Sequence, residues 1–190
     1  MKQETGDTVK DAIAAALIRL MKDKRLEQIT IQEISKQAWV GRSTFYRNFE
    51  SKEDVLHYHI RVLLDASQRE LNPYSDDRLR DFVISQFRLC RKHKDFFIAL
   101  QKNDLLHLLY KQGAVITRDN IAEFDLYRNP YQAVFFSSAA IGVIVQWIEG
   151  GFRESEETMA DIFIYLMDGH HRLRRTQLDN HSGAAEGGSF

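Results

Sequence analysis

Apolar residues recur every three to four positions along most of this 190-residue chain. One stripe runs from Val9 to Met21, a second from Leu79 to Cys90, and a third from Met159 to Met167. This spacing matches the turn of an α-helix, and strand-type alternation is not sustained anywhere. The sequence therefore predicts an all-α fold of about nine helices.

Capping signals set the expected helix limits. Thr30 and Glu33 have the spacing of a capping box, Ser51 and Asp54 have a similar one, and Gly150-Gly151 separates the last two helices. A helix is expected to start at Asn103 or Asp104. The predicted helices cover residues 8–24, 31–38, 42–49, 52–71, 76–92, 94–101, 104–117, 131–149 and 156–168. Residues 118–130 fit a loop or a frayed helix, and 177–190 a disordered tail.

Composition excludes several classes of protein. The 26 basic and 27 acidic residues give a net charge of −1, unlike a polybasic nucleic-acid binder, and Cys90 alone cannot form an intrachain disulfide. The most apolar stretch, 133–148, is too short and mixed to span a bilayer, so we expect a cytoplasmic protein without membrane contact. Motifs of phosphate-binding loops, nucleophile elbows and zinc proteases are absent, so we expect no enzyme activity, cofactor or metal.

The near-zero net charge conceals an uneven distribution. Residues 19–52 contain eight basic and four acidic residues, a local charge of +4, whereas the rest of the chain carries −5. A local positive face on a neutral protein is compatible with DNA binding at one limited site. Charge alone is equally compatible with a solvated helical hairpin.

Residues 30–49 predict two short helices separated by Ala38-Trp39-Val40-Gly41. Such short helices need tertiary packing, which Phe45 and Phe49 are placed to supply by facing the core. This is the layout of a helix-turn-helix, in which the second helix enters the major groove of DNA. Its predicted outward residues, which supply donors for phosphates and base edges, are Arg42, Ser43, Thr44, Tyr46, Arg47 and Asn48.

The run from Ala38 to Phe49, followed by Ser51-Lys52-Glu53-Asp54, resembles the DNA-binding signature of the tetracycline-repressor (TetR) family over about residues 8–57. Two positions depart from that pattern: Trp39 replaces the usual turn glycine, and Gly41 replaces a frequent capping serine. The resemblance implies DNA contacts by Thr30, Arg42, Ser43, Thr44, Tyr46, Arg47, Asn48 and Lys52. Residues 136–163, with Trp147 and Glu149-Gly150-Gly151-Phe152, are similar to a C-terminal domain of Gram-positive regulators in this family.

One such helix reads few base pairs, so a homodimer on a palindromic operator is expected. By the same resemblance, the last two helices form the dimer interface, with an internal core helix as the alternative. The residues assigned to that interface are Phe135, Ile141, Ile144, Val145, Ile148, Met159, Ile162, Phe163 and Leu166.

The segment between these parts is rich in aromatic residues and predicts either an effector cavity or plain core. The candidate pocket residues, suited to a small apolar or aromatic effector, are Phe82, Phe87, Phe97, Leu105, Leu109, Phe124, Tyr127 and Tyr131. We thus expect a DNA-binding domain at 1–55 and an effector-binding and dimerisation domain at 56–176. The predicted function is a repressor released from its operator by an effector. The alternatives are a regulator, including an activator, controlled by a protein coregulator, and a helical interaction module without DNA binding.

Overall fold

A computed structural model describes residues 2–69, 77–111 and 130–167 of the chain, and all structural statements below concern these residues. Their regular structure is helical throughout, which confirms the all-α prediction. The elements are α1 (Lys2–Met21), the 3-10 helix η1 (Leu26–Gln28), α2 (Ile31–Gln37), α3 (Arg42–Asn48), α4 (Lys52–Arg69), α5 (Arg78–Lys92), α6 (Lys94–Lys102) and α8 (Pro130–Glu149). Two further helical segments cover 107–111 and 156–167.

The largest error in the predicted helices concerns the first one, which is expected at 8–24 but covers Lys2–Met21. A smaller error concerns the segment after α6. Residues 103–106 form a turn rather than the start of a helix, and helical structure resumes at 107. Asp104 has a left-handed φ of 59°, and the side-chain amide of Asn103 donates to the Ala99 carbonyl at 2.7 Å. Both residues therefore end α6. The 3-10 helix η1 was not predicted. The segment 118–130, apart from Pro130, and the tail 177–190 lie outside the described residues.

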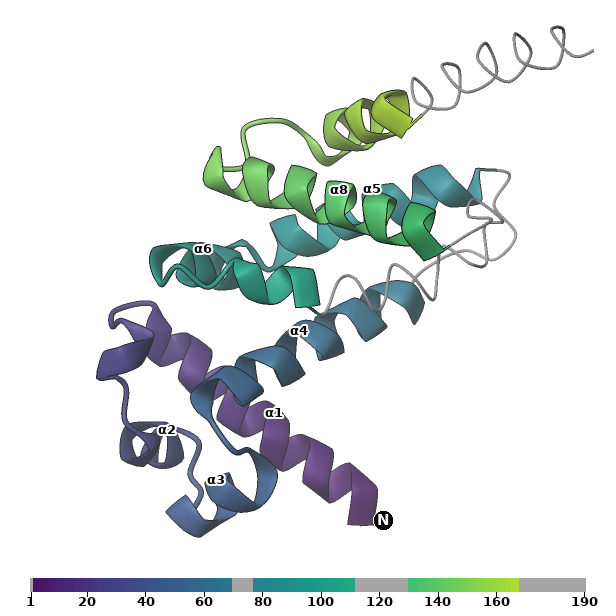
Figure 1. Cartoon of the computed structure of the whole chain (residues 1–190). Coiled ribbons are helices and arrows are strands. Elements are labelled where there is room, and N and C mark those ends of the chain that lie inside the picture. The colour runs from purple at the N-terminus through teal and green to yellow at the C-terminus, as the bar shows by residue number, and fades with distance from the viewer. Residues whose placement is uncertain (1, 70–76, 112–129, 168–190) are drawn as a thin grey trace, which may run out of the picture.

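The N-terminal helices α1, α2 and α3 form a small head (Figure 1). Helices α2 and α3 have seven residues each, too few to be stable in isolation. They are held by a shared core in which Ile13 and Leu17 of α1, Ile34 of α2 and Phe45 of α3 are fully buried. The packing that the sequence predicted for Phe45 and Phe49 is confirmed, because these side chains are 0% and 4% exposed.

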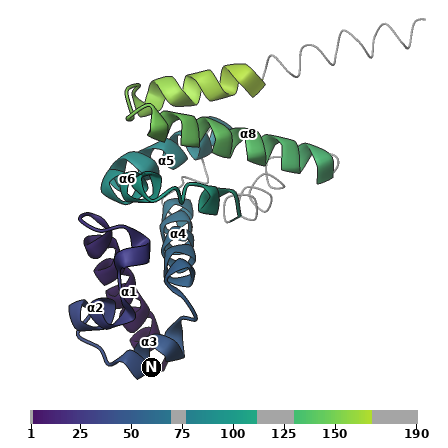
Figure 2. The same cartoon turned by 60° about the vertical axis from the view of Figure 1, so that its left-hand side comes forward.

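Helix α4 runs from the head to the remaining helices, which form the body (Figures 1 and 2). Val55 and Leu56 near its start are fully buried in the core, and the Tyr58 hydroxyl donates to Asp11 of α1 at 2.9 Å. Further along, Ile60 and Leu63 are buried as well. One helix therefore contributes to the packing of both parts.

The body is closed at its far end by α8 and the helix at 156–167, which lie side by side in both views (Figures 1 and 2). The Gly150-Gly151 separation is confirmed: Gly151 has a φ of 80°, and the Phe152 amide donates to the Trp147 carbonyl at 2.9 Å. Ser155 then caps the last helix by accepting from the Thr158 amide at 3.1 Å.

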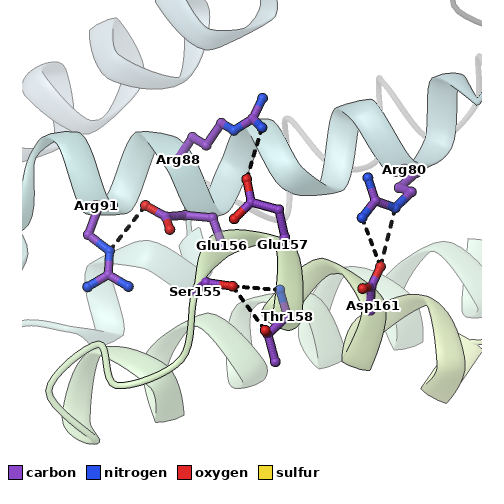
Figure 3. A network of polar contacts seen from close by, with 8 residues as sticks. All are labelled: Arg80, Arg88, Arg91, Ser155, Glu156, Glu157, Thr158 and Asp161. Carbon is purple, nitrogen blue, oxygen red and sulfur yellow. Dashed lines mark hydrogen bonds and ion pairs between the residues drawn. The ribbon is translucent and has the colours of Figure 1, made fainter.

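Three arginines of α5 fasten the last helix to the body (Figure 3). Their ion-pair partners are Asp161 for Arg80, Glu157 for Arg88 and Glu156 for Arg91. Arg91 makes the most contacts of the three. Its guanidinium also donates to the Phe152 and Glu154 carbonyls at 2.8 and 2.6 Å, and it lies 4.8 Å from the centre of the Trp147 ring. It therefore fixes the loop between α8 and the last helix.

A second set of contacts joins the head to α6. The Asn103 side-chain oxygen accepts from the Leu26 amide at 2.6 Å. Around it, Arg25 pairs with Asp104 at 3.1 Å and Lys22 pairs with Asp95 at 2.7 Å. These polar contacts are thus one hydrogen bond and two ion pairs, and the side chains of both ion pairs are exposed.

None of the helices in the described ranges combines the length and apolar character that a membrane crossing requires.

Candidate nucleic-acid interface

Helix α3 presents a polar, cationic side to solvent. Arg42, Ser43, Tyr46 and Arg47 are exposed, with Tyr46 retaining 56% of its surface, while Thr44 is half-buried. The fully buried Phe45 supports this side from below and meets the Tyr46 ring edge-on at 5.6 Å. Four of the six predicted outward residues, Arg42, Ser43, Tyr46 and Arg47, are therefore accessible, and their hydroxyl and guanidinium donors can reach a duplex.

Two of these side chains already have partners within the helix. Arg47 donates through one terminal nitrogen to the Thr44 hydroxyl at 3.0 Å, which leaves its other donors available. The Asn48 amide nitrogen donates to the Thr44 carbonyl at 2.7 Å, and the side chain is half-buried. Asn48 therefore helps to end α3, and its oxygen and second N–H are left for another contact.

Thr30 begins α2 with the predicted capping box, which the structure confirms. Its hydroxyl accepts from the Glu33 amide at 3.2 Å, and the Glu33 carboxylate accepts from the Thr30 amide at 2.9 Å. The Glu33 carboxylate also pairs with Lys24. The Lys24 ammonium, and then the Thr30 donors, lower the pKa of Glu33 to about 2, so this carboxylate stays charged at any ordinary pH.

Lys52 lies at the start of α4, but its ammonium points into the head. It donates to the Leu26 carbonyl and, at 2.9 Å, to the Ile29 carbonyl. These bonds fix the link that carries η1 against the beginning of α4. The structure thus gives Lys52 a positioning role that sequence reasoning did not foresee, because its partners are 23 and 26 residues away.

The turn between α2 and α3 contains an unusual residue. The Val40 amide donates to the Ser35 carbonyl at 3.0 Å and the Trp39 amide to the Lys36 carbonyl at 3.3 Å, the two bonds of a Schellman motif. Trp39 takes the left-handed position with a φ of 58°, and its side chain is 94% exposed. That conformation costs an L-residue about 1–2 kcal/mol. Gly41, the second position that departs from the TetR pattern, is the N-cap of α3 and has an extended backbone conformation.

An apolar cavity of about 90 Å³ lies within the body. Helices α4, α5, α6 and α8 and the two short helical segments all contribute to its wall, and Gln86 is the one amide side chain in it. The lining residues are Ile60, Leu63, Leu64, Leu79, Phe82, Val83, Gln86, Phe87, Leu89, Cys90, Phe97, Leu109, Ala140, Ile141, Ile144, Phe163 and Met167. Burial raises the pKa of the Cys90 thiol to about 12, which keeps it protonated.

The predicted pocket residues divide into three groups. Phe82, Phe87, Phe97 and Leu109 line the cavity. Leu105 packs against the core outside the lining, and Tyr131 is 85% exposed, so these two assignments are corrected. Tyr131 lies roughly opposite Ala140 on α8, because nine residues make two and a half turns. Phe124 and Tyr127 lie outside the described residues.

The cavity residues that the prediction missed come from α4, α5, α8 and the last helix, and α5 contributes the largest share of them. Ile60, Leu63 and Leu64 belong to the apolar side of the helix predicted at 52–71, so helical spacing marked them as interior. The sequence alone does not show which interior side chains border a void.

The nine residues predicted for the dimer interface differ in how much of each side chain is exposed. Phe135, Ile162 and Leu166 are 52%, 41% and 55% exposed, and Ile144 and Val145 are half-buried. Ile141, Ile148, Met159 and Phe163 are at most 8% exposed inside their own chain, so they form its core and not an available surface. Three further exposed apolar side chains on the same two helices are Tyr131, Val134 and Tyr165.

A helix-turn-helix head with an exposed cationic second helix, joined to a helical body with an internal cavity, defines a DNA-binding transcriptional regulator. Two family models agree with this division: "Bacterial regulatory proteins, tetR family" matches residues 13–58, and "Transcriptional regulator C-terminal region" matches 77–169. The chain therefore belongs to the TetR family of transcriptional regulators.

Individual relatives support the same assignment. The HTH-type transcriptional regulator YerO of Bacillus subtilis is 28% identical over 128 residues, 63% of this chain and 44% of that protein. The chain spans less than half the length of the first curated relatives it matches. Among solved structures, the dihydroxyacetone kinase operon activator DhaS aligns with a TM-score of 0.60 at 18% identity, covering 87% of this chain and 97% of its own.

A second solved structure is Thermus thermophilus FadR, a TetR family transcriptional repressor in complex with lauroyl-CoA. It aligns with a TM-score of 0.50 at 18% identity, covering 83% of this chain and 92% of its own. At such identities the likeness concerns the fold alone.

The contacts of Lys52 generate a stability prediction. Lys52→Met keeps the aliphatic stem but removes the donor for the Leu26 and Ile29 carbonyls, so the free energy of unfolding should fall by about 1–2 kcal/mol. Urea unfolding followed by circular dichroism measures this loss. Lys36→Met, at an exposed site on α2, is the matched control and should change stability little. Equal midpoints for the two variants would contradict the positioning role.

Proposed function

We propose that the chain acts as a homodimeric repressor that leaves a palindromic operator when a small apolar effector enters the body. The observation that carries this proposal is the apolar cavity of the body, which is bordered by α4, the helix that also packs in the head. An interior cavity suits a small molecule, whereas a protein coregulator would need an accessible surface. The domain limits of 1–55 and 56–176, and a cytoplasmic location, are retained within this proposal.

DNA recognition is assigned to α3 and its neighbours. Arg42, Ser43, Tyr46 and Arg47 are the exposed candidates for phosphate and base contacts, and Thr44 and Asn48 lie at their margin. Thr30 remains a candidate phosphate contact because it is exposed at the start of α2. Lys52 contributes to DNA binding chiefly by fixing the head, since its ammonium bonds backbone carbonyls.

The DNA proposal predicts that Arg47→Ala and Tyr46→Ala each weaken operator binding by about 10- to 100-fold, because each removes a phosphate or base contact. Operator fragments are first selected from genomic DNA with the purified protein, and affinities are then measured by anisotropy over a range of salt concentrations. Arg153→Ala, an exposed cation of the body, is the matched control and should bind normally. A shallow salt dependence of the unmodified protein would favour a module without a DNA role.

We assign dimerisation to an exposed apolar face on α8 and the last helix, formed by Tyr131, Val134, Phe135, Ile162, Tyr165 and Leu166. Exposed apolar patches of this kind mark interaction surfaces, and these helices lie at the end of the molecule away from the head. A two-fold dimer through this face leaves both α3 helices free to contact DNA.

The dimer assignment predicts that Leu166→Glu produces monomers at micromolar concentration, because a buried unpaired carboxylate opposes association. Sedimentation velocity measures the mass of the variant. Ala66→Glu, on an exposed site of α4, should sediment like the unmodified dimer. A Leu166→Glu variant that remains dimeric would reject this face.

The effector is proposed to be a molecule whose buried part is apolar, such as an acyl chain. The cavity wall supports this class, because Gln86 supplies its one amide while the remaining side chains are apolar or a protonated thiol. The lauroyl-CoA bound by Thermus thermophilus FadR offers a first probe.

The cavity proposal predicts that Ala140→Leu reduces the response to lauroyl-CoA while preserving operator affinity, because the added methyl groups occupy the cavity. Operator release is followed by anisotropy as the probe is titrated. Ala66→Leu, which adds the same atoms on an exposed position of α4, is the control. An undiminished response in Ala140→Leu would show that the effector binds elsewhere.

A further inference from the structure

We infer that Trp39, in the turn before α3, is itself a DNA contact, whose ring packs against the sugar-phosphate backbone and base edges beside the groove that α3 enters. This inference rests on the proposed docking of α3. It adds a contact at the position where the family resemblance places a glycine, and a glycine has no side chain with which to touch DNA.

The first argument is the backbone conformation. Three helices end in the same pair of hydrogen bonds: α2 at Trp39, α6 at Asp104 and α8 at Gly151. Gly151 adopts the left-handed conformation without a side-chain clash, and Asp104 belongs to a residue type that tolerates it and pairs with Arg25. Trp39 has neither advantage, because a bulky residue is unfavourable there.

The second argument is the absence of packing that could compensate. Phe152 also has a left-handed φ, of 58°, but it is 3% exposed and its ring meets that of Trp147 at 4.9 Å. Trp39 is 94% exposed, so its ring gains almost nothing from the fold. A residue in an unfavourable backbone conformation that no packing contact compensates is a candidate for a functional role.

The third argument is position and chemistry. Trp39 lies three residues before Arg42, at the N-terminal end of α3, which in a helix-turn-helix is the end that reaches the bases. An indole ring provides a large, rigid apolar surface at low entropic cost. Deoxyribose and thymine methyl groups are the apolar parts of DNA that such a ring can cover. A duplex is therefore the partner that fits this side chain.

Substitution separates this role from a structural one. Trp39→Gly and Trp39→Asn remove the ring and relieve the backbone conformation, so both variants should unfold at higher urea concentration than the unmodified protein. Both should nevertheless bind the selected operator about tenfold more weakly or worse, because each subunit loses a contact. Trp39→Phe keeps an aromatic ring and should retain more affinity than either. Unchanged operator affinity in the Gly and Asn variants would overturn the inference.

Fluorescence tests the contact in the unmodified chain. Its two tryptophans differ in exposure: Trp147 is 3% exposed and Trp39 is 94% exposed. Acrylamide should therefore quench mainly Trp39, and saturation with the operator should protect that emission. In Trp39→Phe the remaining emission should be weakly quenched with or without DNA. Quenching of the unmodified protein that does not change at saturation with DNA would contradict the contact.

Failure of this inference can be told apart from failure of the proposed function. If the unmodified protein selects no DNA, or Arg47→Ala binds as well as the unmodified protein, the docking of α3 is wrong and the inference falls with it. If Arg47→Ala loses affinity while Trp39→Gly and Trp39→Asn do not, α3 docks as proposed and the inference about Trp39 alone is wrong.

Discussion

The burial of α4 against both the head and the body is the constraint on which the rest of the structure depends. Val55 and Leu56 complete the packing of helices that are too short to stand alone, and Ile60 and Leu63 form part of the cavity wall in the body. Protein interiors are close-packed, so a shift of α4 at the cavity is transmitted along the helix and is not absorbed locally. An effector that moves these residues would therefore change where the head lies.

The second connection between head and body runs through η1 and the end of α6. It contributes less free energy than the burial of α4, but its directional contacts set a defined geometry. Its ion pairs, Lys22 with Asp95 and Arg25 with Asp104, lie between exposed side chains, and such pairs contribute at most about 1 kcal/mol each. The hydrogen bond from the Leu26 amide to Asn103 is partly buried and is better protected from solvent. These contacts define an orientation of the head without locking it, as the proposed release from the operator requires.

What the sequence predicted well depends on local signals. The capping box of Thr30 and Glu33 spans three residues, and the inward direction of Phe45 and Phe49 follows from helical spacing, so both could be read directly. The role of Lys52 could not, because its partners are carbonyls more than twenty residues away in the chain. The departure at Trp39 was visible in the sequence, but its left-handed conformation and exposure required the fold.

Helix α8 shows why the proposed dimer surface is harder to predict than the proposed DNA-binding surface. It is apolar on most of its circumference, so periodicity does not distinguish the side that faces the body from the side that faces a partner. Ile141 and Ile148 turned out to pack inside the chain, while Val134 and Phe135 are exposed. On α3, by contrast, the buried Phe45 and the exposed Arg42 and Arg47 distinguish the two sides. Polarity thus distinguishes a candidate DNA-binding surface from core, whereas a candidate surface for a second apolar surface resembles core until the fold is known.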